Sequence, residues 1–128
     1  MVDEGGLPIR IVLTAGQAHD QKVVPELLSE LAPGCDVVAD RGYDGDAVLD
    51  LIRQAGARAH IPSVQRRLVR RSVDPAVYRK RNLVERFFNK LKHFRRIATR
   101  FDKLAWNYLA AVLLASTRLW LRACESTT

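Results

Sequence analysis

Residues 35–61 read CDVVADRGYDGDAVLDLIRQAGARAHI, and their apolar pattern decides the fold class. The short apolar runs at 35–39 and 57–61 are predicted to form buried strands. Between them, apolar residues recur at helical spacing until Gly56 ends the helix: Ala47, Val48, Leu51, Ile52 and Ala55. A strand, a helix and a strand in this order predict parallel pairing with a right-handed crossover.

The segments on either side extend this α/β pattern. A β-branched run at 7–14 predicts a strand, and a helix is expected from about Asp20 to Pro33, with Pro25 in its first turns. Residues 62–74 are expected to form a basic loop, followed by helices near 77–97 and 104–122. The chain has 128 residues, of which 48% are hydrophobic and 27% charged, so we expect a single core.

Positive charge is concentrated in the second half of the chain. The net charge is +7, and residues 66–103 hold 14 Lys and Arg against three acidic residues, whereas the rest of the chain has a net charge of −4. Such a window predicts binding to a polyanion, foremost nucleic acid, through several phosphate contacts. The alternative interpretation is a solvated helix face.

Several classes of protein are disfavoured. Cys35 and Cys124 are too few for a disulfide framework and lack zinc-ligand spacing, which favours a reducing cytosol. The N-terminus does not resemble a secretory signal. The longest apolar stretch, 104–116, is interrupted by Asn107 and is shorter than the roughly 20 residues that a bilayer requires. We therefore expect a cytoplasmic protein with no membrane span.

The helix near 77–97 has an unusual polar stripe. Its apolar side, wide enough to pack on a sheet, consists of Leu83, Val84, Phe87, Phe88, Leu91 and Phe94. At the border of that side, Arg81, Glu85 and Lys92 share a narrow stripe, and Tyr78 joins it if the helix extends that far back. The stripe predicts a partly desolvated carboxylate between two cations and a phenol. Alternatively, Arg81 and Glu85 form an ordinary i, i+4 ion pair.

Carboxylates near strand ends are further site candidates. Asp40 ends the strand at 35–39, and ligands of open α/β sheets bind outside the carboxyl ends of parallel strands, so we favour a site role over a capping role. For Asp44 and Asp46 we favour capping of the next helix. Asp3, taken by itself, is a turn residue near the terminus.

Together these residues resemble the DDE transposases of bacterial insertion sequences. The family signature is Tyr, two residues, Arg, three residues, Glu, six residues and Lys, and Tyr78, Arg81, Glu85 and Lys92 reproduce each gap. The segment 38–44, VADRGYD, is similar to the one that holds the second catalytic Asp, here Asp40, and the first would be Asp3. Residues 13–20 and 94–103 share the likeness. The resemblance implies a ribonuclease H-like fold, a mixed sheet flanked by helices.

One departure from the family lies at the start of the chain. In the ribonuclease H-like fold the first strand is central and bears the first Asp, but Met1 precedes Asp3 by only two residues. We therefore expect residues 1–128 to form one partial catalytic domain with a truncated first strand. It would lack the N-terminal DNA-recognition region, and an upstream-frame product is a candidate partner.

The resemblance also implies the chemistry. Asp3, Asp40 and Glu85 would be the catalytic residues and the ligands of Mg²⁺ or Mn²⁺, with two ions, because hard cations prefer oxygen donors. Tyr78, Arg81 and Lys92 would contact double-stranded DNA. The implied activity is strand cleavage at the element's ends and strand transfer to target DNA, by a homodimer in a synaptic complex at the bacterial nucleoid. The histidines are interpreted as structural: His19, His60 and His93.

Three other functions are alternatives to this interpretation. A different ribonuclease H-like nuclease shares the triad chemistry, but the spacing around Glu85 argues against it. A catalytically inactive DNA-binding fragment, a remnant or a regulator of full-length transposase, is favoured by the truncated first strand. A basic protein that coats DNA would have no use for Asp40 and Glu85 beside the basic stripe.

Overall fold

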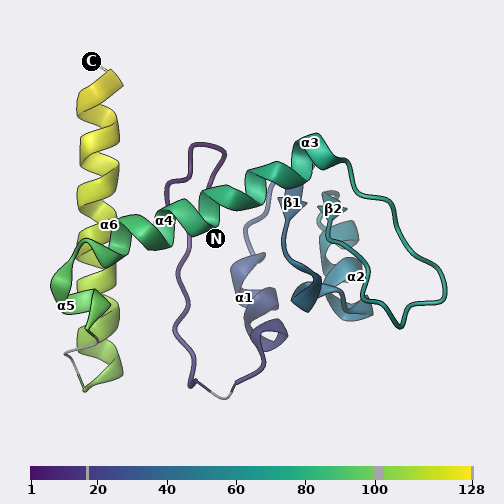
Figure 1. Ribbon diagram of the computed structural model, residues 1–128, viewed down its shortest axis with the longest axis horizontal. Helices are drawn as coiled ribbons and strands as arrows, with labels where there is room; N and C mark the ends of the chain where they lie inside the picture. The colour runs from purple at the N-terminus through teal and green to yellow at the C-terminus, as the bar shows by residue number, and fades with distance from the viewer. Residues whose placement is uncertain (17, 100–102, 128) are drawn as a thin grey trace. The chain divides into compact units, whose positions relative to one another are not determined.

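The computed structural model describes residues 1–16, 18–99 and 103–127 (Figure 1). The chain divides into two compact units. The sheet unit is Thr14–Arg81, and the helical unit combines Met1–Leu13 with Asn82–Thr128. Each unit has its own buried apolar cluster, so the single core expected from the sequence is wrong.

The sheet unit is built on a two-stranded parallel sheet. Strand β1 (Asp36–Val38) pairs with β2 (Arg58–His60), with Val37 opposite Ala59. Helix α2 (Asp46–Gln54) connects them, and Gly56 follows it with φ of 71°, a conformation that favours glycine. The predicted strand, helix and strand are therefore confirmed, including the parallel pairing.

The core of the sheet unit lies under α2. Val48 and Ile52 are four residues apart and share its buried face, where they pack with Ile61 and Val24. Ile52 and Ile61 are only 1% exposed. Val37, Ala39 and Tyr43 are partly buried against this cluster, which fixes the end of β1 and the turn that follows it.

The helix predicted from Asp20 to Pro33 is shorter than expected. A 3-10 helix, η1 (Asp20–Val23), precedes a single α-turn, α1 (Val24–Leu27). His19, not Asp20, is the N-cap of η1. The hydroxyl of Ser29 donates to the carbonyl of Glu26 at 3.0 Å, a local bond that competes with continuation of the helix.

The helix predicted near 77–97 is divided into shorter elements. These are α3 (Pro75–Tyr78), the 3-10 helix η3 (Arg79–Arg81), α4 (Asn82–Lys92) and α5 (Arg95–Ala98). On α4 the predicted apolar side is confirmed at Phe87 and Leu91, which are buried, but Phe88 is 54% exposed. Because a 3-10 turn advances by more degrees per residue than an α-turn, a uniform helical wheel does not relate Tyr78 to Glu85.

The core of the helical unit joins α4, α5 and α6 (Ala105–Thr127). The strand predicted at 7–14 is wrong, because the structure has only an isolated antiparallel bridge between Val2 and Pro8 there. Pro8 has no N–H to donate to a ladder. The segment is held by α6 instead, since the indole N–H of Trp120 donates to the Pro8 carbonyl at 2.8 Å.

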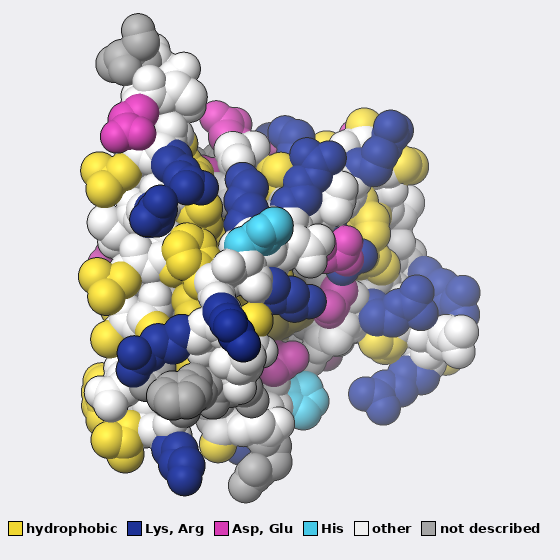
Figure 2. All heavy atoms as spheres, turned by 60° about the vertical axis from the view of Figure 1, so that its left-hand side comes forward, with side chains coloured by type: hydrophobic (Ala, Val, Ile, Leu, Met, Phe, Trp, Pro, Cys, Tyr) yellow, Lys and Arg dark blue, Asp and Glu magenta, His cyan; other side chains and the backbone are white. Residues whose placement is uncertain are grey.

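Helix α6 also keeps an apolar stripe exposed. Trp106, Leu113 and Trp120 follow one another at intervals of seven residues, and Leu114 and Leu121 lie beside them. Figure 2 shows hydrophobic side chains at intervals along this helix. Among the described residues, no helix is both long enough and apolar enough to cross a membrane.

Candidate active site

The carboxylate of Asp3 organises the turn that follows it. Its Oδ1 accepts hydrogen bonds from the backbone N–H of Gly5 at 2.9 Å and of Leu7 at 2.8 Å. The N–H of Asp3 donates to the Leu7 carbonyl at 2.8 Å and closes the turn. The expected turn role is therefore present, and it fixes the orientation of the carboxylate.

This turn packs against the beginning of α4. Gly6 is buried and has φ of 80°, and a Cβ built on it would lie 3.4 Å from Cδ2 of Leu83 and 3.8 Å from the Leu83 carbonyl oxygen. Glu85 is two residues further along the same helix. The contact therefore brings the Asp3 turn to the Leu83 side of α4, whereas Glu85 lies about 200° further round the helix.

Glu85 and Lys92 lie on one face of α4. They are seven residues, or about two helical turns, apart, and both are exposed. Tyr78 and Arg81 are partly buried and belong to the sheet unit, in α3 and η3. The four residues of the signature are thus divided between the two units at Arg81.

Asp40 lies at the carboxyl end of β1, as predicted. The N–H of Ala39 donates to the His60 carbonyl at 3.4 Å, so pairing with the β2 side continues up to the residue before Asp40. Asp40 is the N-cap of the 3-10 helix η2 (Arg41–Tyr43), and its Oδ1 accepts from the Gly42 N–H at 2.8 Å. The side chain is exposed, and the local capping bond does not exclude a site role.

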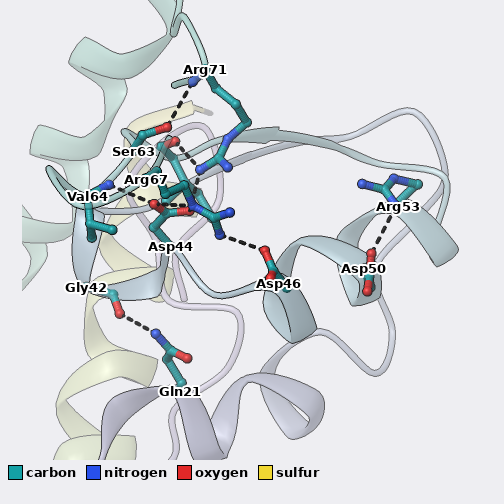
Figure 3. A network of polar contacts seen from close by, with 11 residues as sticks. Gln21, Gly42, Asp44, Asp46, Asp50, Arg53, Ser63, Val64, Arg67 and Arg71 are labelled. Carbon is teal, nitrogen blue, oxygen red and sulfur yellow. Dashed lines mark hydrogen bonds and ion pairs between the residues drawn. The ribbon is translucent and has the colours of Figure 1, made fainter. Parts of the chain in front are cut away.

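The capping role predicted for Asp44 and Asp46 is wrong. Gly45 is the N-cap of α2, and no side chain makes a capping hydrogen bond there. Asp44 instead binds two arginines of the 62–74 segment (Figure 3). The sequence near Asp44 predicted a cap because its arginine partners lie more than 20 residues away, where a local pattern does not reveal them.

The side chain of Asp44 is fully buried and fully paired. Nε of Arg67 donates to both carboxylate oxygens at 2.8 Å, Nη2 of Arg71 donates to Oδ1 at 2.6 Å, and the Val64 N–H donates to Oδ2 at 2.7 Å. Burial raises the pKa of Asp44, but these hydrogen bonds outweigh burial and hold the pKa at about 2. Arg67 also binds Asp46 at 2.8 Å.

The turn between β1 and α2 is held from a second direction by Gln21. Its amide Nε2 donates to the Gly42 carbonyl at 2.8 Å, and a Cβ on Gly45 would lie 2.6 Å from its Oε1. Figure 3 shows this contact beside the Asp44 cluster. Sequence reasoning missed Gln21, Arg67 and Arg71. The sequence signal for this cluster was the pair Arg67 and Arg71, four residues apart and shortly after the buried strand at 57–61.

A second ion-pair group lies across the sheet. Asp36 accepts from Nε of Arg58 at 2.8 Å and contacts Nε2 of His60 at 2.9 Å. The hydrogen bonds from Arg58 and His60 lower the pKa of Asp36 to about 2. His60 therefore contacts a residue of the neighbouring strand. His19, the N-cap of η1, and His93, which follows α4, are exposed.

The three candidate carboxylates are divided between the units. Asp3 and Glu85 belong to the helical unit, and Asp40 belongs to the sheet unit. In the part of the chain that the structure describes, no group of three or more Asp, Glu, His or Cys is gathered for metal binding. The donor set nevertheless fits a hard divalent cation, because all three candidates offer carboxylate oxygens.

Comparison with known proteins identifies the family. The family model described as the transposase DDE domain matches residues 1–120. The chain belongs to the DDE transposase family. It is 38% identical over 123 residues to a putative transposase for insertion sequence element IS6501 of Brucella ovis, covering 95% of each chain. No solved structure matches.

Membership in this family establishes the general activity. DDE transposases act on DNA to move insertion sequences, and they generally use divalent metal ions. This DDE domain contains both helices and strands, as its sequence predicts. Its strands form a small parallel sheet.

The Asp44 cluster generates a stability prediction. We expect Asp44→Asn to lower the free energy of unfolding by roughly 2–3 kcal/mol, less than the loss for a fully buried ion pair because both guanidinium groups are partly exposed. Urea denaturation monitored by circular dichroism measures this loss. Asp50→Asn is the matched control, because the pair of Asp50 with Arg53 is exposed and should change stability little.

The same cluster predicts a pH dependence. The folded pKa of Asp44 lies below its unfolded value of 3.8, so its contribution is fully present above about pH 5 and is lost as the pH falls toward about 2. In acid titrations the Asp44→Asn variant should therefore lose less stability than the wild type over this range. Parallel titration curves would contradict the assigned pairing.

Proposed function

We propose that this DDE domain cleaves DNA strands at the ends of its insertion sequence and transfers the freed ends to target DNA. The observation that supports this most is the match of the transposase DDE domain model to residues 1–120, within which Tyr78, Arg81, Glu85 and Lys92 have the spacing of the family signature. Asp3 and Glu85 belong to the same compact unit. Asp40 follows β1 at the sheet edge where α/β folds bind ligands.

In this proposal Asp3, Asp40 and Glu85 hold the divalent metal, as Mg²⁺ or Mn²⁺ and with two ions. When bound, such ions activate an attacking hydroxyl and stabilise the leaving oxygen of a phosphoryl transfer. The turn bonds to Oδ1 of Asp3 hold its carboxylate in one orientation, which reduces the rearrangement needed for binding. The fold of the complete catalytic domain is proposed to be ribonuclease H-like, with β1 and β2 as part of its mixed sheet.

The basic residues of the signature would position the DNA. Lys92 shares a face of α4 with Glu85, so its ammonium can neutralise a phosphate near that carboxylate. Arg81 is assigned to a second phosphate, and Tyr78 to the backbone or to a displaced base. This DNA-bound role would place the protein at the nucleoid, in the cytoplasm.

The second candidate is a catalytically inactive DNA-binding fragment, either a remnant or a regulator of full-length transposase. One observation favours it, because Asp40 belongs to a different compact unit from Asp3 and Glu85. An upstream-frame product would be the partner that completes a partial catalytic domain, residues 1–128. Metal-dependent nicking by the isolated chain separates the two candidates.

A homodimer in a synaptic complex is also part of the proposal. The stripe on α6 exposes 82% of Trp106, 73% of Leu114 and 58% of Leu121. With side-chain areas of roughly 150–250 Å² each, the whole stripe exposes about 600 Å² of apolar surface. Two copies would bury about 1,200 Å², the lower end of the range for stable interfaces.

The role of Glu85 is tested by Glu85→Gln. In the complete enzyme we expect this variant to abolish strand cleavage but to leave DNA affinity within about threefold, because a neutral amide is a poor metal ligand while the phosphate contacts persist. Cleavage of labelled element ends and filter binding measure the two effects. Glu125→Gln on α6 is the control and should cleave normally; retained cleavage by Glu85→Gln would remove Glu85 from the metal site.

The role of Lys92 is tested by the salt dependence of DNA binding. Lys92→Ala should weaken binding and reduce the slope of log K against log salt by about 0.9, the value for one phosphate of duplex DNA. Lys22→Ala, in η1 and outside the proposed DNA contacts, is the control and should leave the slope unchanged. An unchanged slope would return Lys92 to the solvated surface charges.

The dimer is tested by sedimentation. The wild type should sediment as a dimer at micromolar concentration, and the double variant Leu114→Glu/Leu121→Glu should sediment as a monomer because each copy would place charges in the interface. Arg122→Gln, an exposed change on the same helix, should remain dimeric. A monomeric wild type would exclude this interface.

A further inference from the structure

The segment 62–74, here called the arginine loop, exposes an apolar tip. Leu68 is 102% exposed and Val69 is 83% exposed, the two highest values among the exposed large hydrophobic residues described. They lie between Arg66 and Arg70, which are exposed as well. Figure 1 shows the loop between β2 and α3. An exposed apolar pair at a loop tip has an unfavourable hydration free energy in the isolated protein.

The base of the arginine loop is fixed by an ordered series of hydrogen bonds. Arg71 donates its N–H to the hydroxyl of Ser63 at 2.9 Å and its Nη2 to the Ile61 carbonyl at 3.1 Å. Nearer the tip, Nη2 of Arg70 donates to the Gln65 carbonyl at 3.1 Å. The two sides of the loop are therefore joined up to the tip, and Leu68 and Val69 form its end.

The Asp44 cluster divides the four arginines into two pairs. Arg67 and Arg71 use their guanidinium groups to hold the buried carboxylate, so their charges are largely neutralised within the protein. Arg66 and Arg70 remain at the surface on either side of the apolar tip, and residues 62–73 contain no acidic side chain. The tip thus combines two highly exposed aliphatic side chains with two surface cations, and hydrogen bonds fix the base of the loop.

We propose that the arginine loop is a DNA wedge: Leu68 and Val69 insert between adjacent base pairs of duplex DNA, and Arg66 and Arg70 bind the flanking phosphates. Aliphatic side chains that enter a base step unstack it, and flanking cations offset the cost of the distortion. A protein partner would also cover an apolar tip, but the arginines and the absence of acidic residues from 62–73 favour a polyanion. The wedge rests on the proposed action on DNA and adds local distortion of the duplex.

Unwinding of a closed circular plasmid tests the wedge without knowledge of the recognised sequence. A base step opened by a wedge is untwisted, so relaxation by a topoisomerase in the presence of the protein should leave a changed linking number after the protein is removed. Leu68→Ser/Val69→Ser should reduce this change at least about fivefold while DNA affinity stays within about threefold, because phosphate contacts dominate the affinity. The control Ile9→Ser, an exposed residue of the helical unit, should unwind like the wild type.

The cations of the tip give a second readout. Arg66→Gln/Arg70→Gln should reduce the salt slope of binding by about 1.8, the value for two phosphates. A wild type that binds plasmid without changing its linking number, or a Ser variant that unwinds normally, would overturn the wedge and leave the proposed function intact. Absence of any DNA binding by the wild type would overturn the proposed function itself. If the Ser variant instead changes the sedimentation of the DNA-free protein, the tip is a protein interface and the wedge is wrong.

Discussion

The buried carboxylate of Asp44 is the interaction on which the sheet unit depends most. It binds Arg67, Arg71 and the Val64 N–H, and so connects the turn after β1 to a segment more than 20 residues later. A buried charge without partners would be strongly unfavourable, so the turn and the arginine loop must form together. The same carboxylate therefore holds the end of the turn that begins at Asp40 to the arginine loop.

In the helical unit the corresponding constraint is packing around a glycine. The buried Gly6 lets the Asp3 turn approach Leu83 closely enough that a β-carbon would contact both its side chain and its carbonyl. The bond from Trp120 to Pro8 holds the same N-terminal segment to α6. A segment with little regular structure thus gains a fixed place from two contacts, one with α4 and one with α6, and carries a candidate metal ligand with it.

Local sequence patterns predicted the regular elements well. The periodicity of Val48 and Ile52 predicted α2, and the apolar runs around it predicted β1, β2 and their parallel pairing. Predictions failed where a particular residue or contact prevented the structure that the local pattern favoured. The strand expected at 7–14 has Pro8 in its first positions and pairs only at one bridge, and the helix expected after Asp20 ends early beside Ser29. The spacing of Tyr78, Arg81, Glu85 and Lys92 nevertheless indicated the family, because that signature does not depend on where helices break.

By itself, the sequence determined the α/β content, the apolar faces of α2 and α4, the basic second half and membership in the DDE transposase family. These properties follow from periodicity, charge and residue spacing, which are local or additive along the chain. Only the tertiary structure decided what each aspartate does. Asp40 caps η2, Asp3 closes a turn beside α4, and Asp44 binds two arginines rather than capping α2. The reason is that a carboxylate takes the donors that folding brings within about 3 Å, and for Asp44 those donors lie in a distant part of the chain.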